Sequence, residues 1–253
     1  MTVKELYEKM TMRIPEELRE DWDNDGIMCA PDLSGEVRRV LLTLDVTEEI
    51  VDYAIENAFD LIVSHHPLVF RPLRGLSEED PCARKLIKLV NNGVAVFSFH
   101  TRADKVEGGV NDLLADSLEL HDVVPFGEGD LGRIGTLDEE ATLEDFAFLV
   151  KQQLNSTGIM VSDGYNNVHR VAVVGGDGKD YVRAALEAGA DTFVSGRIGY
   201  NTMEEAAELG INLLEAGHYF TECRITELFS SIISHCIPGV LLENATSNLL
   251  KLL

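Results

Sequence analysis

Residues 38–67 read RRVLLTLDVTEEIVDYAIENAFDLIVSHHP, and this stretch decides the fold. Its first part, residues 38–46, is a β-branched and apolar run typical of a buried strand. Thr47 can then cap a helix from Glu48 to about Ala58, whose apolar residues fall on one face. Residues 60–64 have the pattern of a second strand. Strand, helix and strand in this order predict a β-α-β unit on a largely parallel sheet.

The same order continues and then recurs. A helix at 83–92 and a strand at 94–99 complete the first series. The second series has strands at 170–174, 191–195 and 211–216, with helices at 180–188 and 202–209. The sequence therefore predicts an α/β fold with mostly parallel sheets.

Individual residues of the two series also match. Without gaps, Ala54, Glu56, Asp60, Val63 and Ser64 align with Ala185, Glu187, Asp191, Val194 and Ser195. We infer an internal duplication with pseudo-repeats at about 38–104 and 170–222. Chance is the alternative, because A-x-E-x-x-x-D is common where a helix joins a strand. We expect residues 1–125 and 169–253 to form one core, with 126–168 as an inserted or bridging α+β subdomain.

The composition excludes several classes of protein. The 253 residues carry a formal net charge of −23, which repels phosphate backbones and disfavours nucleic acid as a partner. No apolar run approaches the ~18 residues of a membrane span, and the N-terminus is not a signal peptide. The four cysteines form no CxxC pair and fit reduced thiols. We expect a soluble, cytoplasmic protein.

Side chains that bind metals follow three of the predicted strands, where open parallel sheets place their ligands. The first group is Ser64-His65-His66-Pro67. Pro67 keeps His66 extended and ends regular pairing, so the adjacent histidines could reach two neighbouring ions. The alternative is a pair of loop histidines that only caps the strand.

The other two groups pair a histidine with an acid four residues later, His100 with Asp104 and His218 with Glu222. A helical turn after each strand would place both members on one face. Either pair alone could be a surface hydrogen bond. In combination, four of the seven histidines fall at these three strand ends, which indicates a shared metal site.

Histidine and carboxylate ligands without cysteine suit Zn, Mn, Fe, Co or Ni rather than a closed structural zinc site. Two divalent ions held by two carboxylates and neutral imidazoles would keep a positive charge and favour hydroxide or a small anionic substrate. Such a pair could activate water for hydrolysis. Asp23, in the polar turn after Trp22, is a candidate to support the site, although a simple capped turn is the alternative. Gly175–Gly178 is more typical of a tight turn than of a phosphate site.

Five motifs together resemble one family, the NIF-three-like dinuclear-metal proteins, many of which are described as GTP cyclohydrolase 1 type 2 homologues. The motifs are WDNDG at 22–26, LLTLDVTEE at 41–49, SHHPLVF at 64–70, FHTRAD at 99–104 with GGVND at 108–112, and GHYFTE at 217–222. The resemblance covers about residues 3–250. It implies two metal ions per chain and a ring-shaped homohexamer. It also implies the ligands His65, His66, Asp104, His218 and Glu222, of which the last bridges both ions, and a position for His100 close by.

The chain departs from the family pattern near the site. Ser195-Gly196-Arg197 replaces the usual T-G-(Asp/Glu), and Tyr200–Met203 replaces a common His-His-Asp-Ala run. Asp25 stands where a small apolar residue is common. Arg197 could bind an anionic substrate, or it could mark the loss of the usual chemistry.

These observations favour a metal-dependent hydrolase in which His100 transfers protons. The resemblance alone suggests GTP ring opening as the reaction. The rival class is a non-enzymatic protein that stores, delivers or senses metal or serves as a scaffold, and the departures at Arg197 and Tyr200–Met203 favour it. A nucleic-acid-binding ring is a third possibility, which fits the charge poorly.

Overall fold

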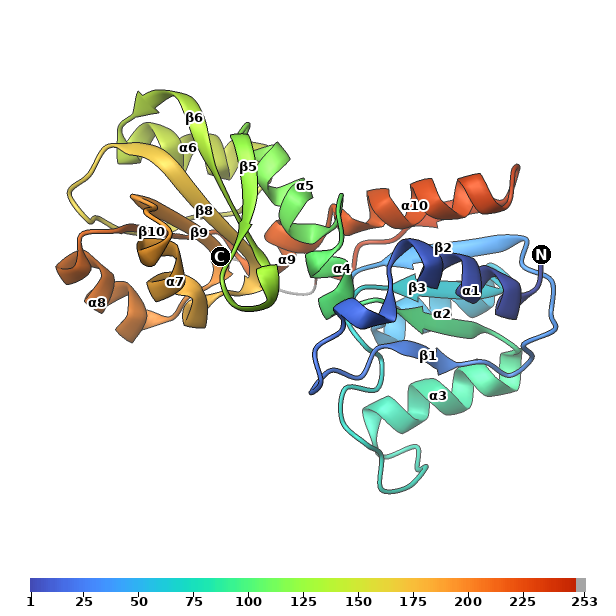
Figure 1. Cartoon of the computed structure of the whole chain (residues 1–253). Coiled ribbons are helices and arrows are strands. Elements are labelled where there is room, and N and C mark those ends of the chain that lie inside the picture. The colour runs from blue at the N-terminus through green and yellow to red at the C-terminus, as the bar shows by residue number, and fades with distance from the viewer. Residues whose placement is uncertain (249–253) are drawn as a thin grey trace. The chain divides into compact units, whose positions relative to one another are not determined.

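The computed structural model describes residues 1–248, which form two compact units (Figure 1). Unit 1 comprises residues 1–106 and 225–248, and the described part of unit 2 is 107–224. This division differs from the predicted one, because residues 126–168 are not set apart from a core. They belong to unit 2, where their strands hydrogen-bond into its sheet. Residues 249–253 of the predicted core lie outside the described residues.

The sheet of unit 1 has five strands in the order β1-β4-β3-β2-β11. Three of its four strand pairs are parallel, and only β1 pairs antiparallel, with β4. The three strands predicted from the first series are present. The bounds are β1 (Gly26–Cys29), β2 (Arg39–Thr43), β3 (Leu61–Ser64), β4 (Ala95–Ser98) and β11 (Leu241–Asn244).

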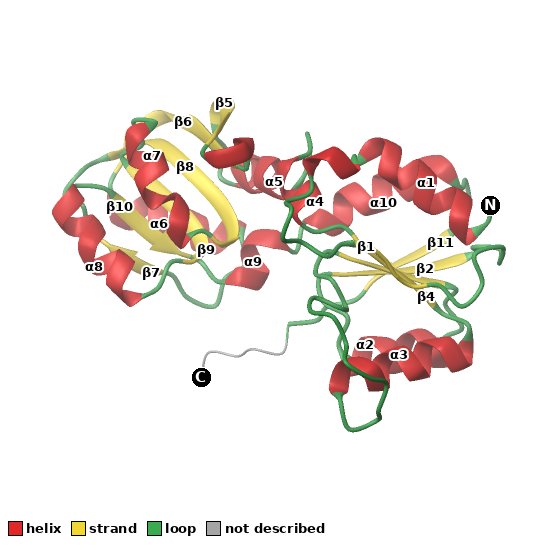
Figure 2. Cartoon of the chain, turned by 60° about the horizontal axis from the view of Figure 1, so that its bottom comes forward, coloured by secondary structure: helices red, strands yellow, loops and turns green. Residues whose placement is uncertain are grey.

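Helices cover both faces of this sheet (Figure 2). On one face lie α2 (Glu48–Glu56) and α3 (Pro81–Asn92), and on the other α1 (Val3–Arg13) and α10 (Ile225–Cys236). Thr47 caps α2 as expected, since its side chain accepts a hydrogen bond from the amide of Ile50. Two shorter elements, the 3-10 helix η1 (Glu16–Leu18) and the helix α4 (Thr101–Lys105), complete the unit.

The sheet of unit 2 has six strands in the order β5-β6-β8-β9-β10-β7. Strands β8, β9 and β10 are parallel neighbours, and the other three pairs are antiparallel. The bounds are β5 (His121–Phe126), β6 (Gly132–Ala141), β7 (Met160–Ser162), β8 (Val168–Asp177), β9 (Thr192–Arg197) and β10 (Asn212–Glu215). The 3-10 helices η2 (Glu128–Asp130) and η3 (Lys179–Tyr181) lie in its connections.

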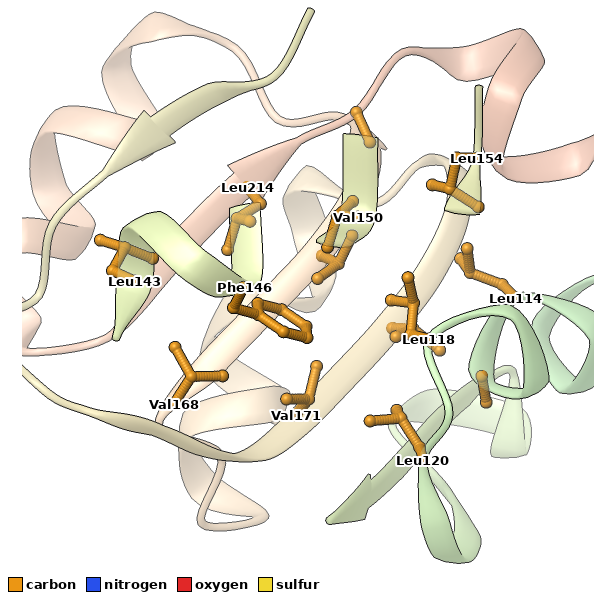
Figure 3. Close-up of a cluster of buried hydrophobic side chains, with 14 residues drawn as sticks. Leu114, Leu118, Leu120, Leu143, Phe146, Val150, Leu154, Val168, Val171 and Leu214 are labelled. Carbon is orange, nitrogen blue, oxygen red and sulfur yellow. The ribbon is translucent and has the colours of Figure 1, made fainter. Parts of the chain in front are cut away.

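The core of unit 2 has one apolar cluster on each face of the sheet. On one face α5 (Val110–Ser117) and α6 (Leu143–Gln153) pack against β8, and Phe146 and Val150 of α6 share an apolar cluster with Val171, drawn in Figure 3. On the other face lie α7 (Val182–Glu187) and α8 (Tyr200–Leu209). The short helix α9 (His218–Glu222) follows β10.

The structure confirms the α/β class, but both sheets are mixed, and the expectation of mostly parallel sheets is corrected. The second sheet accounts for most of the difference, since only two of its five strand pairs are parallel. A hairpin, β5–β6, and the short edge strand β7 add the antiparallel pairs. Antiparallel strands of this kind need only a tight turn and carry no crossover helix, so they leave no β-α-β pattern in the sequence.

The two predicted repeats share backbone contacts. Asp60 and Asp191 are aligned, and each accepts hydrogen bonds from two consecutive amides at the start of the preceding parallel strand. The donors are Arg38 and Arg39 for Asp60, and His169 and Arg170 for Asp191. Such matched details are what a duplication would leave, and the duplication itself stays an inference.

Candidate metal centre

His65 lies at the end of β3 and is fully buried. Its Nδ1 is 2.9 Å from the carbonyl oxygen of Phe99. A carbonyl only accepts, so Nδ1 carries the proton and Nε2 keeps its lone pair. This Nε2 is 3.4 Å from Oδ1 of Asp104, which the helix α4 presents to it. A histidine fixed through Nδ1 in this way has the arrangement found in metal sites.

His66 is oriented by a carboxylate that the sequence patterns did not single out. Its Nδ1 lies 2.7 Å from Oδ1 of Asp45, which follows β2. Asp45 is held in turn by Ser247, whose hydroxyl is 3.1 Å from Oδ2 and accepts from the Asp45 amide. A carboxylate on Nδ1 fixes the tautomer and makes Nε2 a more basic ligand. Asp45 is therefore a positioning residue for His66.

His100 is the N-cap residue of α4, and its side chain is also fixed by an acid. Its Nδ1 is 2.8 Å from Oδ1 of Asp23. The second oxygen of Asp23 accepts hydrogen bonds from the amide and the hydroxyl of Thr101, at 3.0 and 2.7 Å. Asp23 thus accepts hydrogen bonds on both oxygens and holds the ring of His100, and its support of a metal site stays a prediction.

These three imidazoles form one cluster in unit 1. The ring centres of His65 and His66 are 4.9 Å apart, and that of His100 lies 5.2 Å from the first and 5.6 Å from the second. One ring nitrogen of each lies within 4.8 Å of the others, which is close enough for shared coordination of a cation. The donor set therefore fits a divalent ion such as Zn or Mn.

The charges around His100 shift its titration. Burial raises the pKa of Asp23, but hydrogen bonds from His100 and Thr101 outweigh this and lower that pKa to about 2. Burial lowers the pKa of His100, whereas its hydrogen bond to Asp23 and the charges of Asp104 and Asp23 raise it, and the net shift is upward. Asp23 is consequently anionic at neutral pH, and His100 is suited to hold a proton.

A buried ion pair holds the backbone at His100 in place. Nε of Arg102 is 2.9 Å from Oδ2 of Asp25, and neither side chain is exposed. The guanidinium also lies over the ring of Phe99, 4.4 Å from its centre. The same Asp25 oxygen accepts the amide of His100 at 3.1 Å. Asp25, which departs from the family pattern, thus has a partner within this chain and helps to fix the backbone of His100.

In unit 2 the expected pair stands on α9, where Nε2 of His218 is 3.0 Å from Oε2 of Glu222. Glycines of two neighbouring strand ends make room for this helix. A Cβ at Gly176 would lie 2.2 Å from Oε1 of Glu222, and one at Gly196 would lie 2.8 Å from Cα of His218. The stretch GGDG at 175–178 is not the tight turn that the sequence favoured, because its first three residues belong to β8. Gly176 lies within β8 and gives the carboxylate its place.

Arg197 ends β9 and is exposed. It makes no ion pair with any of residues 1–248, which leaves it available to an anion. Tyr200 begins α8 and is 75% exposed. Nearby, Oε2 of Glu215 accepts the amides of Ile198 and Gly199, at 2.6 and 2.9 Å.

The structure thus brings the predicted residues together in two sets, one in each unit. Unit 1 gathers His65, His66, His100 and Asp104, with Asp23 behind them. Unit 2 gathers His218 and Glu222. Joint coordination by both sets stays a prediction. Among helices in the described chain, none is long and apolar enough to cross a membrane.

Comparisons with known proteins agree with this fold and with the motifs. A family model, Duf34/NIF3 (NGG1p interacting factor 3), matches residues 1–248. The chain is 34% identical over 215 residues to a Clostridium perfringens protein called GTP cyclohydrolase 1 type 2 homolog, and the match covers 82% of each.

Solved structures show the same architecture. A Staphylococcus aureus hypothetical protein superposes with a TM-score of 0.89 at 25% identity, over 100% of this chain and 99% of that one. Reduced HcgD from Methanocaldococcus jannaschii gives a TM-score of 0.85 at 26% identity, over 96% and 97% of the two chains. The clustered imidazoles and carboxylates at the strand ends define a candidate metal-binding α/β protein. The chain belongs to the Duf34/NIF3 family, as the resemblance suggested.

Proposed function

We propose that the protein binds two divalent metal ions through His65, His66, Asp104, His218 and Glu222, and that it is a metal-dependent hydrolase. The observation that carries the proposal is that the Nδ1 atoms of two histidines are already hydrogen-bonded to acceptors. Those of His65 and His66 face a carbonyl and a carboxylate, so that Nε2 of each carries the lone pair with which the ring would bind a metal. One ring nitrogen of His65 and one of His66 lie within 4.8 Å of each other, a spacing that allows the two side chains to bind neighbouring ions.

Within this proposal the residues of the chain have distinct tasks. The ions would supply Lewis-acid activation of water. Asp23 holds Nδ1 of His100 and so directs the other ring nitrogen toward the cluster. His100 can then take a proton from the nucleophile and return it to the leaving group. Arg197 is free to hold an anionic part of the substrate.

The metal proposal is tested by elemental analysis of protein purified without chelator. Two ions per chain are expected in the wild type, and His66→Ala and Glu222→Gln should each lose metal. His121→Ala is a matched control, because His121 also pairs with an acid, Asp138 at 3.3 Å, but stands on the exposed strand β5. Metal content that is unchanged in both site variants would refute the ligand assignment.

The reaction is tested separately. The name of the Clostridium perfringens relative supports GTP as the first substrate to assay. Protein loaded with Mn or Zn should convert GTP to a ring-opened product. Absence of turnover with every metal would remove the cyclohydrolase proposal and leave metal binding untouched.

A non-enzymatic metal-binding, metal-delivery or scaffold protein is the second candidate. It is favoured by Arg197, which replaces an acid of the family pattern with a cation. His100→Gln discriminates the two candidates. Loss of turnover at unchanged metal content supports the hydrolase, and no effect on either property supports the second candidate.

We also propose, from the family resemblance, that the chain assembles as a homohexameric ring in the cytoplasm. Native mass spectrometry should then give six chains per particle, and a monomer at micromolar concentration would overturn this.

A further inference from the structure

Two large aromatic side chains stand exposed beside the imidazole cluster of unit 1. Trp22 is 64% exposed and Phe70 is 48% exposed. Their ring centres are 6.2 Å apart, and they lie 6.1 and 6.2 Å from the ring of His100. Exposing large aromatic side chains to water is unfavourable, so two of them exposed side by side at a polar site indicate a surface that binds a ligand. We call Trp22 and Phe70 the aromatic rim.

The rim is held in place by the polar residues around it. The side-chain amide of Asn24 donates to the carbonyl of Val69, which joins the two segments of the rim although they are 45 residues apart. Asp23, next to Trp22, is bound to His100 and Thr101. The backbone on which both rings stand is therefore fixed, while the rings themselves reach solvent. A preset pair of this kind gives up little conformational entropy when a planar ligand binds.

The segment that carries Phe70 is positively charged, although the chain as a whole is strongly acidic. Arg71 follows Phe70 directly, and Arg74 comes three residues later in the same exposed segment. Neither arginine makes an ion pair with a residue of the described chain, in a protein whose acids outnumber Lys and Arg by 44 to 21. Two cations left without a carboxylate in so acidic a chain favour an anionic group on the ligand.

We propose that Trp22 and Phe70 bind the flat ring of a heteroaromatic substrate at the His100 face of the site, with Arg71 and Arg74 serving its negatively charged group. The substrate class is accordingly a nucleotide. Aromatic side chains stack on any base because every base has a π-face, whereas a sugar phosphate lacks one. This inference rests on the proposed function, since it places the ring beside the residues that would carry out the chemistry.

Intrinsic fluorescence tests the proposal directly, because Trp22 is the only tryptophan of the chain. Titration of the full-length wild-type protein with GMP and with AMP should quench this fluorescence saturably. Ribose 5-phosphate, which has no base, should cause no saturable change. Guanosine, which has no phosphate, should bind more weakly than GMP.

Variants separate the ring contact from the charge. Phe70→Ala should weaken GMP binding about fivefold to a hundredfold, the range for loss of one stacking side chain, and Phe70→Tyr should restore it. Phe148→Ala is the control, because Phe148 is 62% exposed but stands on α6 of unit 2. The double variant Arg71→Ala, Arg74→Ala should weaken GMP binding and leave guanosine binding unchanged.

Three outcomes would overturn the proposal: no saturable quenching by either nucleotide, equal quenching by ribose 5-phosphate, or unchanged GMP affinity in Phe70→Ala. The metal content of each variant is measured in parallel. Quenching without bound metal or turnover would overturn the proposed hydrolase alone. Metal and turnover without quenching would overturn the aromatic rim alone.

Discussion

The glycine at position 176 offers a sharp test of how Glu222 is placed. Gly176→Ala would put a methyl carbon 2.2 Å from Oε1 of Glu222. That separation is far below van der Waals contact, so the carboxylate has to move. Gly176 also has a φ of +64°, which costs any residue with a Cβ about 1–2 kcal/mol. The substitution therefore combines backbone strain with displacement of a proposed ligand.

A second glycine isolates the strain. Gly210 is the C-cap of α8 in the same unit, with a φ of +71°, and within the described chain a Cβ there would meet only the carbonyl oxygen of Gly164, at 4.0 Å. Gly210→Ala should lower the free energy of unfolding by a similar 1–2 kcal/mol and leave metal binding intact. Gly176→Ala should lower metal affinity by about 10–100-fold or more. Mutation of a residue that only hydrogen-bonds to a metal ligand already has an effect of this size.

The assay is competition with a calibrated chelator, together with urea unfolding of the metal-free proteins. The expected result is similar destabilisation of the two variants and a loss of affinity in Gly176→Ala only. Equal metal affinity in the two variants would refute the assignment of Glu222 as a ligand, because its carboxylate cannot keep its present place beside an alanine.

Three further predictions concern the acids of unit 1. Asp45→Ala should lower metal affinity about 10–100-fold in the chelator assay, because His66 loses the carboxylate that orients it, and Asp45→Asn should retain more affinity; equal affinities in all three proteins would contradict this. Asp25→Ala should cost about 3–5 kcal/mol in urea unfolding, because it leaves the buried guanidinium beside it unpaired; a cost under 1 kcal/mol would argue against a buried pair. The pKa of Asp23, raised by burial but lowered further by hydrogen bonds such as that from His100, falls to about 2, below its ordinary value. The ionised carboxylate therefore stabilises the folded state above about pH 5, and this contribution is lost as the pH falls toward 2. The difference in unfolding free energy between wild type and Asp23→Asn should shrink between pH 5 and pH 3. A constant difference would show that the carboxylate is not stabilised as the structure indicates.

Much of the site could be predicted from the sequence because parallel strands end at a common edge. The buried runs before His65 and before His100 identify neighbouring strands, and this alone places both imidazoles at one edge of the sheet. The spacing of four residues to Asp104 predicted the turn that α4 forms.

Other features depend on contacts that no local pattern encodes. Asp45 serves His66 only because the parallel register of β2 and β3 brings their ends together, and Ser247, which holds it, is 202 residues away. Arg102 looks like a surface residue in the motif HTRAD, yet it is fully buried because Asp25 neutralises it. The antiparallel strands of unit 2 likewise show no alternation of apolar and polar residues that would distinguish them from their parallel neighbours.

The shared contacts of Asp60 and Asp191 bear on how the two units came to differ. In the alignment that they support, His65 and His66 correspond to Gly196 and Arg197. If both units descend from one ancestral segment, the copies have specialised in opposite directions. The first kept bulky nitrogen donors at its strand end, and the second gave up side-chain volume there, since a Cβ at Gly196 would meet the backbone of α9. Substituting histidines at positions 196 and 197 would therefore displace α9 rather than create a second set of imidazoles. Simple back-substitution could not restore the symmetry between the two copies.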